Sequence, residues 1–103
     1  MHSELNYNET VIFEWNEDKA ETNFKKHKVG FEEAESVFYD PLSVTIPDPD
    51  HSIDEYRFLD IGTSDNSRLL IVVYTERMDR IRIISARKAT KTERKKYEEE
   101  NQR

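Results

Sequence analysis

The stretch RLLIVVYTERMDRIRIISARKA, residues 68–89, carries the strongest fold signal in the sequence. Its first part is almost continuously apolar, which is typical of a central strand covered on both faces. The residues RMD then form a turn, and a second strand follows in which isoleucine alternates with arginine. Strands joined by so short a turn pair antiparallel, so this stretch predicts the middle of a meander.

The arginines of the second strand leave two interpretations open. Arg80 and Arg82 alternate with isoleucines, so the isoleucines face one way and these arginines the other. Arg87 has the opposite parity and joins them only if the strand ends or bulges near Ser85. The arginines form either surface ion pairs, each worth about 0–1 kcal/mol, or a site that holds phosphate through bidentate hydrogen bonds.

Three further strands are indicated by β-branched and aromatic residues, at residues 10–15, 42–46 and 56–64. With the helices described next, they predict a small α+β domain of order β-α-α-β-β-β-α. The last three strands form an antiparallel meander, and the helices pack on one face of the sheet. We expect one domain over residues 1–103, with a flexible N-terminus at 1–9 and a frayed C-terminus at 100–103.

The helices are located by caps and breakers. Asn16 offers an N-cap for a first helix, which KVG at 28–30 ends. A second helix restarts at Phe31 and stops at YDP, because the residue before a proline avoids helical geometry. Thr90 and Glu93 form a capping box for a last helix that reaches about residue 100. One face of the first helix carries Ala20, Phe24 and His27.

Charge is distributed unevenly along the 103 residues. The formal net charge is −6, which argues against wholesale coating of nucleic acid. Residues 80–96, however, hold eight basic residues and one acid, a local charge of +7, whereas residues 30–60 hold nine acids and one arginine, or −8. Such a chain can bind an anion on one side and repel it on the other.

The composition excludes several classes of protein. The sequence has no cysteine, so disulfides and thiolate metal sites are excluded. No apolar run approaches membrane-spanning length, and residues 1–10 lack the apolar core of a signal peptide. We therefore expect a cytoplasmic protein with no membrane association.

Lys26 and His27, in KKHK at 25–28, have two interpretations. Cations at this place suit the C-terminus of the first helix, which is the commoner reason for them. Alternatively, His27 is a proton-transfer group and the flanking lysines hold phosphate. Against that role, His27 shares a face with Ala20 and Phe24, as a partly buried structural histidine would. Among the aromatic residues, Trp15 and Tyr74 are expected in the core, and Tyr97, beside the basic face, remains a candidate for base stacking.

Two other possibilities carry less support. His51 lies among carboxylates, but the spacing matches no metal motif, and a solvated loop is favoured. The two short helices meeting at KVG suggest a helix-turn-helix, yet the second begins with Glu32, Glu33 and Glu35, which would repel DNA. His2, close to the N-terminus, is set aside.

Three blocks of the sequence resemble the BrnT family, the toxins of a type II toxin–antitoxin system. The first is FEWNEDKAETNFKKHKVGFEEAESVFYDP, with Trp15, Lys19, Asn23 and the KH pair. YRFLDIGTS follows, with Arg57 and Gly62, and then RIRIISARKATKTERKKYEE. Together the blocks cover nearly everything from residue 11 to 99. One departure is visible: the family usually has glycine after KH, where this chain has Lys28.

The resemblance implies a fold similar to that of RelE-like ribonucleases and a metal-independent, cofactor-free cleavage of RNA that stops translation. The implied partner is a BrnA-like antitoxin, a ribbon-helix-helix protein that blocks the toxin and binds operon DNA, so this chain meets DNA only indirectly.

Roles follow from this chemistry, in which the RNA 2′-hydroxyl attacks its own phosphate. His27 is the acid or base, with Glu55 a weaker candidate base. Arg57, Arg82 and Arg87 hold the phosphate. Substrate-binding support comes from a second set of residues: Lys26, Arg80, Lys88 and Tyr97. The alternative is a non-catalytic module that binds RNA or an acidic protein with the same basic patch.

Overall fold

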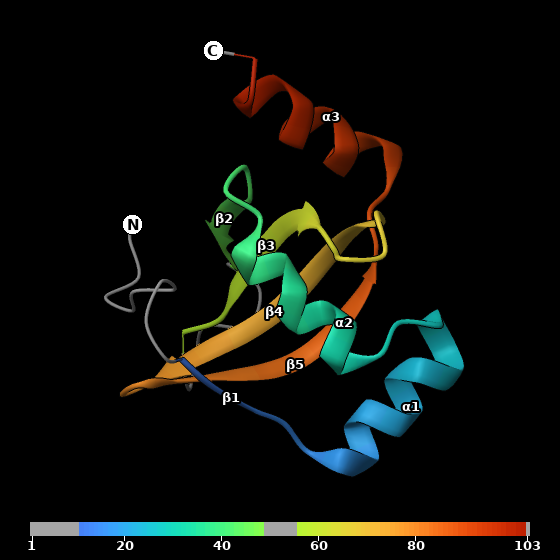
Figure 1. The fold of residues 1–103 in the computed structure, drawn as a ribbon, viewed down its shortest axis with the longest axis vertical. Coiled ribbons are helices and arrows are strands. Elements are labelled where there is room, and N and C mark those ends of the chain that lie inside the picture. Colours follow the sequence, from blue (N-terminus) through green and yellow to red (C-terminus); the bar gives the residue numbers. More distant parts are fainter. Residues whose placement is uncertain (1–10, 49–55, 103) are drawn as a thin grey trace.

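A five-stranded sheet forms the centre of the computed structural model, which describes residues 11–48 and 56–102. Figure 1 shows the elements in chain order. Their bounds are β1 Ile12–Glu14, α1 Glu17–His27, α2 Phe31–Ser36, the 3-10 helix η1 Val37–Tyr39, β2 Val44–Pro47, β3 Phe58–Thr63, β4 Leu69–Arg77, β5 Arg80–Lys88 and α3 Lys91–Glu100. No helix in these described segments is long and apolar enough to span a membrane.

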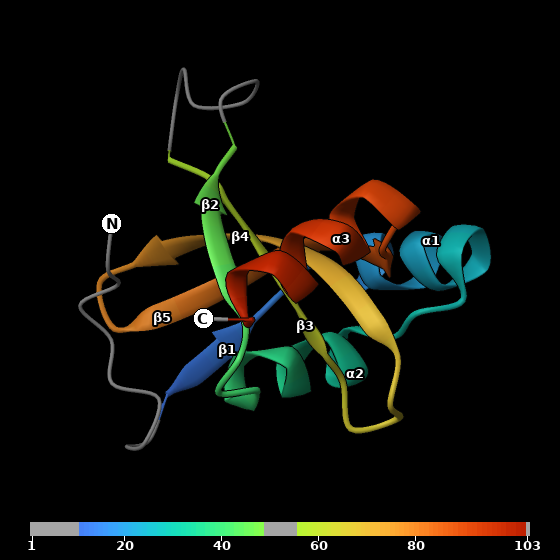
Figure 2. The ribbon, with the colours of Figure 1, turned by 90° about the horizontal axis from the view of Figure 1, so that it is seen from above.

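The sheet order is β1-β5-β4-β3-β2, so the apolar β4 is the central strand, as its composition predicts. The antiparallel meander is confirmed, since β2, β3, β4 and β5 pair antiparallel in succession. Each of the five predicted strand ranges overlaps an observed strand, but the order written for them, β-α-α-β-β-β-α, is one strand short, because four strands separate α2 from α3. β1 also pairs parallel with β5, which makes the sheet mixed, and Figure 2 shows these two strands side by side.

A bulge interrupts the pairing of β4 with β5. Val73 pairs with Ser85, but the next residue, Tyr74, pairs with Ile83. Ile84 is therefore an extra residue on β5, opposite no partner. Such a bulge shifts every later side chain of the strand to the other face of the sheet.

The bulge brings the arginines of β5 to one face. Arg82 pairs with Thr75 and Arg87 pairs with Ile71. Thr75 and Ile71 are four residues apart on β4 and so face the same way. The condition on which Arg87 could join the arginine face, a bulge near Ser85, is thus met.

The helices cover both faces of the sheet, so the prediction of helices on one face was wrong. One core lies under α1, α2 and η1 and includes Phe31, Ala34, Val37, Val72, Tyr74, Ile81 and Ile83. A smaller core on the other face consists of Ile61, Leu69 and Ile71, with Tyr97 of α3 packed against it. Figure 1 shows α3 apart from α1 and α2.

Helix α1 turns a polar residue toward the sheet. Asn23 is its buried residue, at 7% exposure, whereas Phe24 is 53% exposed. The Asn23 amide donates to the Ala86 carbonyl at 2.9 Å and to the Val29 carbonyl at 3.0 Å, and its oxygen accepts from the Ala86 N–H at 3.1 Å. Of the face with Ala20, Phe24 and His27, Ala20 packs against the core, whereas Phe24 is exposed.

The predicted helix caps are present. Asn16 accepts a hydrogen bond from the Lys19 N–H, and Thr90 and Glu93 form the complete capping box of α3. At the end of α1, Lys28 has φ 60° and ψ 33°, the left-handed conformation that glycine adopts most easily. This lysine occupies the cap position where the resembling family has glycine, so the departure leaves the helix end in place.

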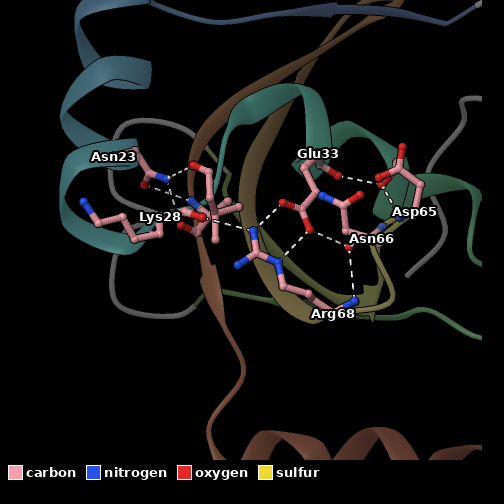
Figure 3. A network of polar contacts seen from close by, with 10 residues as sticks. Asn23, Lys28, Glu33, Asp65, Asn66 and Arg68 are labelled. Atoms are coloured by element: carbon pink, nitrogen blue, oxygen red, sulfur yellow. Dashed lines mark hydrogen bonds and ion pairs between the residues drawn. The ribbon is translucent and has the colours of Figure 1, made fainter.

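An ion pair joins α2 to the turn between β3 and β4, as Figure 3 shows. Arg68 donates through Nε to Glu33 Oε2 at 2.9 Å and through Nη2 to the Lys28 carbonyl at 3.0 Å. Ser64 donates to the same Glu33 carboxylate. Arg68 chiefly, with Ser64, holds the pKa of Glu33 below its ordinary value. Glu33 therefore joins α2 to the turn between β3 and β4.

Gly62 allows η1 to approach the sheet. A Cβ built on this residue would lie 2.8 Å from Val37 Cγ1, closer than packed side chains allow. The glycine of the YRFLDIGTS block is therefore explained by packing.

We predict that Asn23→Ala lowers the free energy of unfolding by about 3 kcal/mol, because it leaves the buried Val29 and Ala86 groups unpaired. Urea unfolding measures the change. Lys25→Ala, on the exposed side of the same helix, should change stability by at most about 0.5 kcal/mol. Equal stabilities of the two variants would show that the amide pairing contributes little.

Asp60 gives the protein a pH-dependent stability. Burial raises the pKa of this carboxyl to about 6, against hydrogen bonds from Thr45 and Tyr74. Between about pH 4 and pH 6 the Asp60 carboxyl is therefore protonated in the folded chain and ionised in the unfolded chain. The free energy of unfolding falls as pH rises through that window. We expect Asp60→Asn to gain about 3 kcal/mol over the native chain between pH 4 and pH 7, measured by urea unfolding. Parallel curves for the two proteins would contradict this.

Candidate active site

Among the described residues, α3 covers one end of the sheet face that carries the arginines of β5. At that end Tyr97 packs over Ile61, Leu69 and Ile71. By the strand register, Arg80, Arg82 and Arg87 of β5 lie along the same face, and β1 adds Glu14, which pairs with Arg82. The described residues thus place a row of guanidinium groups on the sheet face that α3 covers at one end.

The three arginines of β5 all have carboxylate partners. Glu14 lies 3.4 Å from Arg82 Nη1 and 3.6 Å from Arg80 Nη1. Arg87 donates from Nη1 and Nη2 to the two oxygens of Glu93, at 2.8 Å each. This fork, with the Thr90 N–H, lowers the pKa of Glu93 to about 2. Such pairs orient the guanidinium groups more than they stabilise the fold, since partly exposed pairs are worth about 0–1 kcal/mol.

Arg57 immediately precedes β3. Because Phe58 pairs with Tyr74, extending the register by one residue places Arg57 opposite Thr75, which pairs with Arg82, and so on the same face. Its Nε is buried and has no hydrogen-bond partner within the described part of the chain. A buried donor without an acceptor is uncommon, and a bound anion would satisfy it.

Lys26 and His27 line a hollow of about 340 Å³ between α1 and β5. The strand contributes Ile84 and Ser85 to it, the residues of the bulge. These two stand between Arg82 and Arg87 on β5, so the hollow adjoins the arginine face. The end of α1 is thereby brought beside two of the predicted phosphate-holding residues.

The remaining candidates lie farther from this arrangement. Arg80 is exposed near the β4–β5 turn. Lys88 is exposed and pairs with Leu70, on the opposite parity to Arg87. Tyr97 donates to Asp40 at 2.7 Å, and burial raises the pKa of its hydroxyl. Tyr97 thus fastens α3 to the domain, and its predicted contact with substrate stays a prediction, as do the other site assignments.

Sequence reasoning missed the carboxylates that face the arginines. Glu14 reaches Arg82 only because β1 pairs parallel with β5, a contact between residues 68 positions apart. Glu93 carried a visible signal, the capping box, but its second role toward Arg87 did not show in the pattern. Asn101, in the segment predicted to fray, donates to the carbonyls of Leu42 and Tyr97.

Glu55, His51 and His2 lie outside the described residues. Within residues 11–48 and 56–102, no group of three His, Cys, Asp or Glu side chains is arranged to hold a metal ion.

Comparison with known proteins connects this geometry to a family. The family described as "Ribonuclease toxin, BrnT, of type II toxin-antitoxin system" matches residues 15–93. Among solved structures, the crystal structure of the Brucella abortus ribonuclease toxin BrnT is similar, with a TM-score of 0.63 and 24% identity over 80% of this chain and 100% of that one. Curated proteins give no match. The family match spans most of the chain, and the chain therefore belongs to the BrnT family of ribonuclease toxins of type II toxin–antitoxin systems.

Proposed function

We propose that this chain is an endoribonuclease that cleaves RNA without a metal ion and so inhibits translation in the cytoplasm. The observation that carries the proposal is the line from Arg57 through Thr75 to Arg82, with Arg87 on the same face and His27 at the adjoining hollow. Guanidinium groups on one surface suit the oxygens of a phosphate, and Arg57 has a buried Nε donor without an acceptor among the described residues.

In the proposed reaction the 2′-oxygen attacks the adjacent phosphorus while the bond to the 5′-oxygen of the next nucleotide breaks. A base takes the proton of the 2′-hydroxyl, and an acid gives one to the departing 5′-oxygen. His27 fills one of these roles. The arginines stabilise the negative charge that develops on the phosphate oxygens. The products are a 2′,3′-cyclic phosphate and a 5′-hydroxyl.

The proposed partner is a BrnA-like antitoxin of the ribbon-helix-helix class, which blocks this toxin and carries the DNA-binding activity of the pair. The membership of a type II family supports an antitoxin partner. Under this proposal the chain touches RNA directly and DNA only through its antitoxin.

One observation favours the second candidate, a module that binds RNA or an acidic protein without turnover. Glu14 and Glu93 already occupy the arginines of β5. A ligand must displace or share these partners, which weakens the hold on a transition state. Incubation with RNA in EDTA separates the two candidates, because only the enzyme yields 2′,3′-cyclic phosphate ends.

Arg82→Ala is expected to abolish growth arrest on induced expression while antitoxin binding is kept, because it removes a guanidinium from the proposed phosphate site. Arg94→Ala, an exposed arginine on α3, is the matched control and should remain toxic. Full toxicity of the Arg82 variant would remove this residue from the site.

His27→Asn should lower the cleavage rate constant in EDTA by about 10²–10⁴-fold, the range for loss of a proton-transfer group. The dissociation constant for a non-cleavable RNA should change much less, because the imidazole acts on the reaction and contributes little to binding. A rate within about twofold of the native enzyme would assign the proton transfer to another group.

A further inference from the structure

The outer edge of β5 is covered in two places and open between them. β1 pairs with β5 as far as Arg82. Asn23 of α1 then pairs with the backbone of Ala86. Between these points, at Ile84 and Ser85, the described residues place neither a strand nor the Asn23 amide against the edge. The hollow of about 340 Å³ lies here, between α1 and the bulge.

The Asn23 anchor sets which side of α1 overlooks the hollow. Lys19 and Lys26 lie four residues before and three residues after Asn23, spacings that put them on its side of the helix. Both line the hollow, together with Thr22. Lys19 is about one turn before the anchor and Lys26 about one turn after it. The packing of the helix thereby brings both lysines to the same opening.

These lysines differ from the other cations near the site. Neither Lys19 nor Lys26 forms an ion pair with another described residue, whereas Lys25 pairs with Glu21 at 3.9 Å. The arginines of β5 are likewise paired with carboxylates. Among the residues that line the hollow, the acid is Asp18. An incoming anion therefore meets two lysines that form no ion pair with a described residue, and the single carboxylate of Asp18 opposes them.

The lining suits a nucleotide of single-stranded RNA. Ile84 offers an apolar surface to a base or sugar, Thr22 and Ser85 offer hydroxyl groups, and the lysines match a phosphate. The hollow also lies close to the proposed phosphate site, because Ile84 is two residues from Arg82, about 7 Å along β5. A phosphate held at Arg82 would leave the neighbouring nucleotide beside the hollow.

We propose that this hollow is a second nucleotide subsite, in which Lys19 and Lys26 bind a phosphate next to the one that is cleaved and Ile84 contacts its base or sugar. The inference rests on the proposed function for the identity of the ligand as RNA. It adds Lys19, Thr22, Ile84 and Ser85 to the substrate-binding surface, and it makes recognition depend on more than one nucleotide.

The test is binding of a single-stranded RNA oligonucleotide with 2′-O-methyl groups, which the proposed reaction cannot cleave. Fluorescence anisotropy at several salt concentrations gives the slope of log affinity against log salt. Lys19→Ala should weaken binding and reduce the slope by about 0.7, the loss of one phosphate contact on a single strand. Lys19→Arg should restore the slope, and Lys25→Ala should keep the native value.

Three outcomes would overturn the subsite: a native slope for Lys19→Ala, an equal loss for Lys25→Ala, or no RNA binding by the native chain. Binding with the expected slopes but no cleavage by the native chain would support the subsite and remove the proposed enzymatic function, so the two failures are distinguishable. Unfolding curves of the Lys19 variants should match that of the native chain, since Lys19 makes no contact that a purely structural role would need.

Discussion

The side chain of Asn23 takes the place of a neighbouring strand at Ala86 of β5. Its amide meets the Ala86 peptide with one donated and one accepted hydrogen bond, which is the pattern by which neighbouring strands pair. Through this contact α1 is fixed beside β5, and the positions of Lys26, His27 and the hollow follow from it. A chain with only 35% hydrophobic residues thus docks a helix through a polar group, because the hydrogen bonds are complete.

The bulge at Ile84 is the second constraint, and it serves the surface of the sheet more than its core. Without the extra residue, Arg82 and Arg87 would point to opposite faces, and one of them would replace a core side chain. With it, both guanidinium groups lie on the arginine face while Ile83 and Ala86 stay buried. A single inserted residue therefore allows an apolar core and a row of arginines to share one strand.

Local patterns predicted much of this structure. Capping residues and the apolar run of β4 are properties of a few neighbouring residues. The parity of Arg87 likewise left open whether β5 ends or bulges near Ser85, and the structure shows the bulge. The features that were missed depend on contacts between distant segments. Three of these features have no counterpart in the periodicity of the sequence: the parallel pairing of β1 with β5, the position of α3 on the opposite face of the sheet from α1 and α2, and the ion pair of Glu14 with Arg82. The Asn23 anchor of α1 was missed because it is polar, and hydrophobic periodicity does not register an asparagine.

Glu93 takes part both in the N-terminal cap of α3 and in the ion pair with Arg87. Its Oε1 atom accepts from Arg87 and from the Thr90 N–H, so one carboxylate closes the α3 cap and holds a proposed phosphate ligand. The remaining ties of α3 to the domain include the hydrogen bonds of Tyr97 and Asn101. An anion that binds the Arg87 guanidinium would thus displace Glu93 and lower the stability of α3. Occupancy of the site and fraying of the C-terminal segment become thermodynamically linked, each favouring the other to the same extent.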